Sequence, residues 1–377
     1  MRKFVFYILF ALSAAACIYP YDAELPSDTP KRLVVSGDIL IGEQSPIDLS
    51  YVRPLSATFN IDGALPEGSV RVENDKGQFF LGRPGKNGRF TVDTRLARED
   101  ALYRLVVKLK DGREYNTPWT GVNAAPVIED LSYDYDETNV HIYCTLDGRD
   151  SIRNFRWDYE EVWEYHADFI PDFVYTGRGQ YLSIPKYKNY YYCWDQNSSI
   201  EPLIASAEDL TVNRVEHNNF ITIGRTDNKM SYLYSVNLTV TGLSHSARVY
   251  LEHIRDFSTL TGDLFSPTPS EMRGNIYNVS DPKEPVVGFV SVCKRATRRL
   301  FIEASGIHIS TVNPDHLLFI PEPNEYGWID YDWYFEKNSP VREEMGTGIL
   351  WAPKRCVDCR VRGGTKNKPE WWPNDDV

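Results

Sequence analysis

Apolar and polar residues alternate along much of the first third of the chain. Between residues 103 and 109, apolar side chains at the odd positions alternate with Arg104 and Lys108. A period of two predicts a strand with one buried face, and Asp111-Gly112 then supplies a tight hairpin turn. Further short apolar runs, separated by Asn- and Gly-rich turns, lie at 70–72, 79–81 and 90–92. We therefore expect residues 31–124 to form an immunoglobulin-like β-sandwich.

The sequence Asn123-Ala124-Ala125-Pro126 interrupts this pattern. Proline cannot donate a backbone hydrogen bond to a sheet and restricts the residue before it, so a domain boundary is expected here. Residues 125–377 are predicted to form a larger β-rich domain with one or two helices and a cysteine-containing C-terminal tail. The fold class is therefore mainly β.

An aromatic stripe lies near the start of this second region. It occupies odd positions, interrupted by Glu161, with mostly charged residues between: Phe155, Trp157, Tyr159, Trp163 and Tyr165. In a strand these side chains share one face, which favours a role in the core of a sandwich. The alternative is a platform on which sugars stack. A second aromatic cluster follows at 187–194, so the candidate ligand-binding aromatics are Trp157, Trp163, Tyr190 and Trp194.

One helix is predicted near residues 246–260. Tyr250, Ile254 and Phe257 share a face at helical spacing. Ser244 or Ser246 is suited to cap the start, and Gly262 is suited to end the helix. Glu252 and His253 lie on this helix, but they lack the second histidine of a metalloprotease motif and are expected to be solvated.

The N-terminus has the pattern of a lipoprotein signal. Arg2 and Lys3 precede an apolar run and three alanines, and Cys17 follows. We expect residues 1–16 to be removed and Cys17 to be lipidated. Residues 17–30 contain three prolines and three acidic residues, which is typical of an extended tether. Ala14 stands where such signals usually carry leucine, so an ordinary secretory leader is the alternative.

The composition is typical of a folded, exported protein with an acidic net charge. The apolar run at the N-terminus is shorter than the roughly 20 residues that a transmembrane helix needs. Removal of a leader carrying Arg2 and Lys3 changes the formal net charge from −12 to −14. This charge disfavours nucleic acid and anionic headgroups as partners.

Five cysteines follow Cys17, an odd number for an oxidising compartment. Cys356 and Cys359 have C-x-x-C spacing, but no second cysteine or histidine pair accompanies them to complete a zinc site. A structural disulfide is favoured, with Cys193 as a distant partner. Which two of Cys193, Cys356 and Cys359 pair stays open.

The motifs of common catalytic sites are missing from the sequence. It contains no nucleophile elbow, phosphate-binding loop or dinucleotide-binding turn. Asp134, Asp136 and Asn139 depart from calcium-loop spacing and indicate a solvated acidic loop. Glu160 and Glu161 are adjacent, so in a strand they point to opposite faces and form no catalytic pair. We predict no catalytic residue, no metal and no cofactor.

Several stretches, in order along the mature chain, resemble the Bacteroidota outer-membrane lipoprotein family filed as domain of unknown function four-two-four-nine. These stretches are 33–39, 157–165, 193–194, 264–270, 274–276, 356–360 and 369–372. The acidic residues after Cys17 are also similar to the export signal of surface lipoproteins in this phylum. The resemblance implies an outer-membrane lipoprotein, often encoded beside a TonB-dependent receptor, with no established activity.

Our leading hypothesis is a binding or accessory subunit of a TonB-dependent receptor in nutrient uptake, anchored by lipid in the outer membrane at the cell surface. The alternatives are a surface glycan or peptide hydrolase and a structural or adhesive surface protein. The sequence leaves open the ligand, the oligomeric state and whether the protein faces the periplasm or the exterior.

Overall fold

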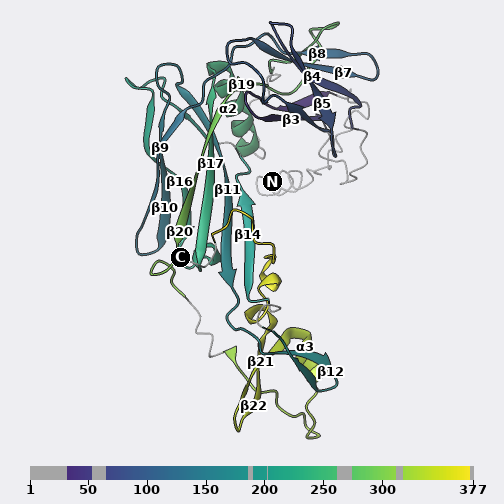
Figure 1. The fold of residues 1–377 in the computed structure, drawn as a ribbon, viewed down its shortest axis with the longest axis vertical. Coiled ribbons are helices and arrows are strands. Elements are labelled where there is room, and N and C mark those ends of the chain that lie inside the picture. The colour runs from purple at the N-terminus through teal and green to yellow at the C-terminus, as the bar shows by residue number, and fades with distance from the viewer. Residues whose placement is uncertain are drawn as a thin grey trace, which may run out of the picture.

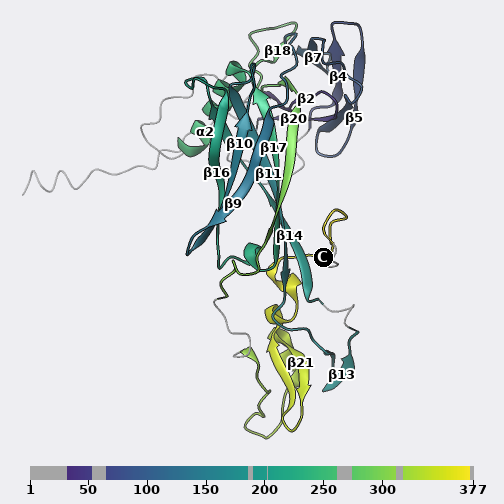
Figure 2. The ribbon, with the colours of Figure 1, turned by 60° about the vertical axis from the view of Figure 1, so that its left-hand side comes forward.

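The protein consists mainly of β-strands, which confirms the predicted fold class. The computed structural model describes residues 32–52, 65–185, 190–201, 203–260, 274–310 and 317–373. The N-terminal sheet lies at one end of the long axis, beside a central body of two sheets. A smaller hairpin unit forms the other end (Figures 1 and 2).

The N-terminal strands form one continuous eight-stranded sheet. Its order is β1 (Leu33–Gly37), β3 (Gln44–Tyr51), β6 (Arg89–Asp93), β5 (Phe79–Pro84), β4 (Gly68–Asn74), β7 (Tyr103–Leu109), β8 (Glu114–Asn116) and β18 (Tyr277–Asn278). The alternation in β7 places Leu105 and Val107 opposite Val72 and Val70, and all four are buried. The strands expected in a sandwich thus join into a single sheet around one core.

The central body contains two facing sheets. The first has the order β16 (Arg214–Gly224), β10 (Asn139–Asp147) and β9 (Val127–Tyr135). The second has the order β14 (Tyr192–Ser198), β11 (Asn154–His166), β17 (Leu233–Leu243) and β20 (Arg295–Glu303), and β15 (Leu203–Ser206) also pairs with β11. A 3-10 turn, η2 (Asn228–Met230), precedes β17. Apolar side chains from both sheets pack into one core.

A later segment of the chain returns to the N-terminal sheet. β18 pairs with β8, and β19 (Val292–Cys293) pairs in parallel with β2 (Ile39–Leu40). Ile276, Val286, Val290 and Val292 belong to the N-terminal core. Residues 276–293 therefore pack with the first 124 residues, although they lie far beyond the break at 123–126.

Helix α2 (His245–Leu260) lies close to the predicted range of 246–260. Ser244 Oγ accepts a hydrogen bond from the backbone N–H of Ala247, which caps the start as expected. Ala247 and Tyr250 are buried on its inner face. The helix contacts β11 and β17 and lies between the N-terminal sheet and the central body (Figure 1).

The hairpin unit is built from two short antiparallel pairs and one helix. β12 (Phe173–Gly177) pairs with β13 (Gln180–Ser183), β21 (Asn338–Glu344) pairs with β22 (Gly348–Pro353), and α3 (Tyr331–Lys337) lies beside them. The chain then forms the 3-10 turns η4 (Lys354–Cys356) and η5 (Cys359–Arg362) and returns along β14. Across the described ranges, no helix combines the length and apolar character needed to span a membrane.

Candidate functional site

A cleft separates helix α2 from the N-terminal sheet and the returning segment. Its first chamber has a volume of about 700 Å³, within the roughly 300–1,000 Å³ usual for small-molecule sites. Polar side chains line much of it: Thr120, Asn123, Ser244, His245, Ser246, His253, Asn275 and Ser291. Val249, Tyr250 and Phe289 add apolar surface. None of the described residues lining this chamber is acidic, so its polarity comes from hydroxyl, amide and imidazole groups.

Two aromatic rings divide the cleft. Tyr250 and Phe289 line both the first chamber and a second one of about 440 Å³. Their ring centroids are 5.6 Å apart, which is contact distance. Burial raises the pKa of Tyr250, so its hydroxyl stays protonated at neutral pH. The divider is therefore uncharged.

The floor of the second chamber is the outer face of the β11–β17–β20 sheet. Because Phe155 and Trp157 point into the core, the even-numbered residues of β11 point outward. The strand register aligns them in two polar rows, Arg156–Thr241–Arg295 and Asp158–Thr239–Thr297. Helix α2 and strand β1 form other walls.

Ion pairs across this chamber join the N-terminal sheet to the central body. Arg156 Nη2 lies 2.9 Å from Asp38 Oδ2, and the backbone N–H of Ser291 donates to Asp38 Oδ1 at 3.0 Å. Arg295 similarly pairs with Glu43 at 2.6 Å. Burial by itself would lower the pKa of Arg156, but the carboxylates of Asp38 and Asp158 outweigh it and raise that pKa. The guanidinium is therefore always charged.

A carboxylate fixes the start of α2, which forms one wall of the first chamber. Glu208 accepts hydrogen bonds from Asn154 Nδ2 at 2.8 Å and from Arg248 Nη2 at 3.1 Å. Its Oε1 also lies 3.0 Å from His245 Nδ1. The bonds from Asn154 and His245 lower the pKa of Glu208. The position of the helix start therefore depends on partners outside the helix.

Two of the four candidate ligand-binding aromatics are buried, and two are more exposed. Trp157 and Trp163 lie in the core with 3% and 8% of their surface exposed, so they offer no stacking platform. Tyr190 is partly exposed, but the guanidinium carbon of Arg360 lies 3.3 Å from its ring centroid. The backbone of Trp194 pairs with Thr365 of the C-terminal tail.

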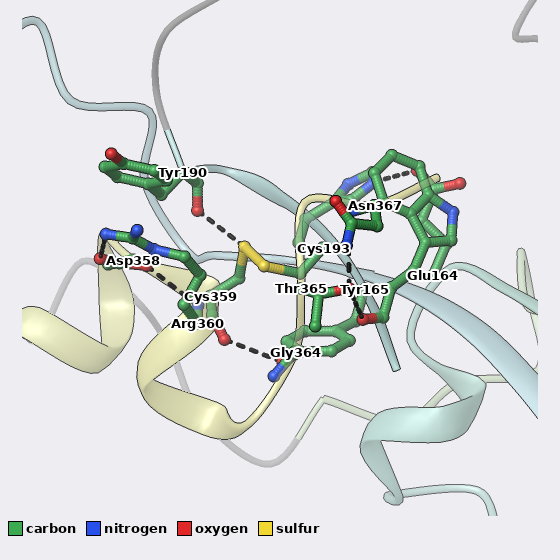
Figure 3. Close-up of a disulfide and its surroundings, with 12 residues drawn as sticks. Glu164, Tyr165, Tyr190, Cys193, Asp358, Cys359, Arg360, Gly364, Thr365 and Asn367 are labelled. Atoms are coloured by element: carbon green, nitrogen blue, oxygen red, sulfur yellow. Dashed lines mark hydrogen bonds and ion pairs between the residues drawn. A yellow bond between two sulfur atoms is a disulfide. The ribbon is translucent and has the colours of Figure 1, made fainter. Parts of the chain in front are cut away.

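A disulfide joins two of the three candidate cysteines, Cys193 and Cys359 (Figure 3). Cys356 is a free, buried thiol. The hydroxyl of Tyr165 donates to the carbonyl of Cys359 at 2.8 Å and accepts from the N–H of Gly364 at 2.8 Å. The disulfide and these bonds hold the C-terminal tail against β11 and β14.

Other sequence predictions concern lipidation and metals. Cys17 lies outside the described residues. Within those residues, no group of three or more histidine, cysteine or acidic side chains is placed to hold a metal ion. Asp136 accepts three hydrogen bonds from Thr138 and Asn139 and forms part of a turn. Glu252 pairs with Arg248 at 2.8 Å, and His253 is an exposed residue at the wall of the first chamber.

Sequence reasoning missed the residues that form the cleft. Arg156 and Asp158 were recognised only as the charged side of the aromatic stripe. Phe289, Asn275 and Thr241 carry no local signal for a site. The alternation in β11 does show that its even residues face outward, but it does not show which strands lie beside them.

The residues that line both chambers lie within a region that matches a known family. The family described as Domain of unknown function (DUF4249) matches residues 18–299. The chain belongs to this family. The matched range includes Asp38, Arg156, Thr241, Phe289 and Arg295, whereas the disulfide partner Cys359 lies beyond it.

Other comparisons add little about this family member. No curated protein matches the chain. One similar solved structure is that of a "putative carbohydrate binding protein" from Bacteroides uniformis ATCC 8492. It is 8% identical, and the similarity covers 58% of this chain and 93% of that one with a TM-score of 0.13. A TM-score this low supports no conclusion about fold or function.

Proposed function

We propose that the protein is an outer-membrane lipoprotein that captures a ligand in the α2 cleft as an accessory subunit of a TonB-dependent receptor. The observation that carries the binding role is the two-chambered cleft divided by Tyr250 and Phe289. Pockets that combine aromatic surface with a few oriented polar groups are typical of small-molecule sites. The site lies within the residues that match the family, 18–299.

The chemistry of the lining favours binding over hydrolysis. Hydrolysis of glycans commonly requires two carboxyl groups, one on each side of the scissile bond. The described residues of the first chamber include no carboxylate. In the second chamber Asp38 and Asp158 both lie within 3.3 Å of Arg156, so each already has a cationic partner. The cleft is therefore better suited to hold a ligand than to cleave one.

The N-terminal pattern supports the location in this proposal. A lipidated Cys17 followed by a tether of about a dozen residues would hold the cleft near the membrane without inserting the protein. Two or more acyl chains give lasting attachment, because each buried methylene contributes about 0.8 kcal/mol. A receptor in the same membrane would then receive its ligand from a protein confined to its surface.

Copurification tests the partnership. The tagged protein is expressed from its native locus, and the outer membrane is solubilised in mild detergent. We expect the wild-type protein to recover a TonB-dependent receptor and Cys17→Ser to recover much less. Repeated recovery of the wild-type lipoprotein alone would refute the accessory role.

Growth tests the cleft. Val249→Trp places a large ring in the first chamber, whereas Arg255→Trp changes an exposed position on the same helix that lines neither chamber. We expect Val249→Trp to reproduce the nutrient-dependent growth defect of a deletion strain and Arg255→Trp to grow normally. Equal growth of both variants at normal protein levels would show that the cleft is not used.

A further inference from the structure

Two buried polar atoms in the second chamber have no hydrogen-bond partner among the described residues. They are Thr241 Oγ1 and Arg156 Nε. Thr241 is 1% exposed, and Arg156 Nε lies 3.3 Å from Asp158 Oδ2 without hydrogen-bond geometry. Buried polar groups are normally paired, because an unpaired one loses its hydration without compensation. Both side chains line the chamber, so a bound group there could complete their bonding.

The polar rows of this floor continue down the outer face of the sheet. A third row, Glu160–Asn237–Arg299, follows the first two. We call these three rows the polar track, which extends about 13 Å from residue 156 to residue 160. The side chains of Asp158 and Arg295 are 44% and 36% exposed, and Glu160 is also exposed. The track is therefore open to solvent beyond the chamber.

Aromatic rings bound the polar track at both ends. Tyr250 and Phe289 lie above it, at the divider of the cleft. At the lower end, the guanidinium carbon of Arg299 lies 3.6 Å from the ring centroid of Trp371. Trp371 is 44% exposed, whereas the neighbouring Trp372 is buried and donates to Glu164 at 2.8 Å. The tail thus packs against the lower part of the sheet, and the Trp371 indole stays partly exposed beside the track, with Arg299 over one of its faces.

The polar track carries charges of both signs. Its cations are Arg156, Arg295 and Arg299, and its carboxylates are Asp158 and Glu160. Asp38 and Glu43 of the N-terminal part pair with the first two arginines. Three cations facing four carboxylates leave no excess positive charge for an anionic ligand. The track offers donors and acceptors side by side, which suits an uncharged ligand whose groups both donate and accept.

We infer that the polar track binds a linear chain of neutral sugars, with one end in the second chamber. This inference rests on the proposed function, since it names the ligand class of the same cleft. Sugar hydroxyls both donate and accept, so they match the hydroxyl of Thr241 and the neighbouring Arg–Asp pairs. Phe289, which is partly exposed, and Trp371 provide apolar surface for sugar rings at the two ends of the track.

An extended peptide fits the polar track less well. Peptides commonly bind sheets by adding a strand to a free edge, where unpaired backbone groups are available. The polar track crosses the face of three strands that are already paired with one another. Only side chains are offered there, and they include arginines, carboxylates and hydroxyl groups.

Binding to a glycan array tests this inference with the purified full-length lipoprotein in detergent. The array carries neutral, acidic and sulfated oligosaccharides of several lengths, and uncharged peptides serve as competitors. We expect retention of neutral oligosaccharides, with affinity rising with chain length. Retention of no neutral glycan, a preference for acidic glycans, or displacement by the peptides would overturn the inference.

Thr241→Val removes the unpaired hydroxyl without changing the shape of the side chain. We expect about tenfold weaker binding of the retained glycan, since one hydrogen bond is lost. The melting temperature of the ligand-free protein should not fall, because no internal bond is broken. Thr91→Val, at a partly buried position of β6 that lines neither chamber, is the control and should leave binding unchanged. A lower melting temperature for Thr241→Val would show that the hydroxyl has an internal partner and refute its assigned role.

Trp371→Ala tests the lower end of the polar track. We expect weaker binding of long oligosaccharides and unchanged binding of disaccharides, because only a long chain reaches the indole. Equal loss for both lengths, or no loss for either, would contradict a track of this extent. Copurification of the receptor is measured separately, so failure of the sugar proposal is distinguishable from failure of the accessory role.

Discussion

The Cys193–Cys359 disulfide is predicted to be a major contributor to stability. The two cysteines are 166 residues apart, and both are fully buried. Loop-closure entropy for a separation of this size corresponds to roughly 5 kcal/mol, and measured effects usually fall below the calculated value. We expect the double variant Cys193→Ala/Cys359→Ala to lose about 4 kcal/mol of unfolding free energy. For a chain of this length, that loss lowers the melting temperature by about 5 °C.

The loss should be concentrated at the C-terminal tail. Without the disulfide, the tail is held by the hydrogen bonds of Tyr165, the backbone pairing of Thr365 and the indole of Trp372. Limited trypsin digestion should therefore cleave after Arg360 or Arg362 sooner than in the wild type. Calorimetry and digestion are compared in the same buffer.

Cys356→Ala is the matched control, because Cys356 is a buried thiol near the same turn but is not in the disulfide. We expect it to lose at most about 1 kcal/mol. Peptide mapping without reductant should recover a linked pair of peptides carrying Cys193 and Cys359. A link from Cys193 to Cys356, or a double variant that melts within 1 °C of the wild type (about 1 kcal/mol), would refute the reasoning.

Three further predictions concern buried groups. Lys229→Met leaves the Glu161 carboxylate, which is 2% exposed, without the cation 2.8 Å away. We expect chemical denaturation to show a loss of about 3–5 kcal/mol of unfolding free energy, largely recovered by adding Glu161→Gln. A double variant as unstable as the single variant would contradict this. Gly364→Ala adds a methyl group that overlaps the Tyr165 hydroxyl, so tryptic cleavage of the tail should accelerate, and unchanged cleavage would argue against tight docking. Burial raises the pKa of Cys144 to about 12, so it should resist thiol reagents at pH 8 until the protein is unfolded; labelling of the folded protein would disprove its burial.

Local sequence patterns were sufficient to predict strand β7 and helix α2. The alternation at 103–109 and the helical spacing of Tyr250 and Ile254 each depend on residues a few positions apart, and β7 and α2 lie where these patterns place them. The split of β11 into an apolar face and a charged face was also visible. Such predictions succeed because the period of a strand or helix determines which side chains share a face.

The cleft and the polar track could not be predicted in this way. Thr241 lies between Arg156 and Arg295 only because β17 pairs with both β11 and β20. Likewise, Phe289 reaches the divider because residues 276–293 return to the N-terminal sheet. No pattern within a few residues encodes these pairings.

The sequence alone therefore determined the mainly β fold, the position of helix α2, the acidic charge and the family resemblance. The tertiary structure decided the partner of Cys193, the core position of Trp157 and Trp163, and the assembly of a site from five distant segments. The physical reason is that strand order and register depend on burial and hydrogen bonding between residues far apart in the sequence, such as Asp38 and Ser291, which are 253 positions apart.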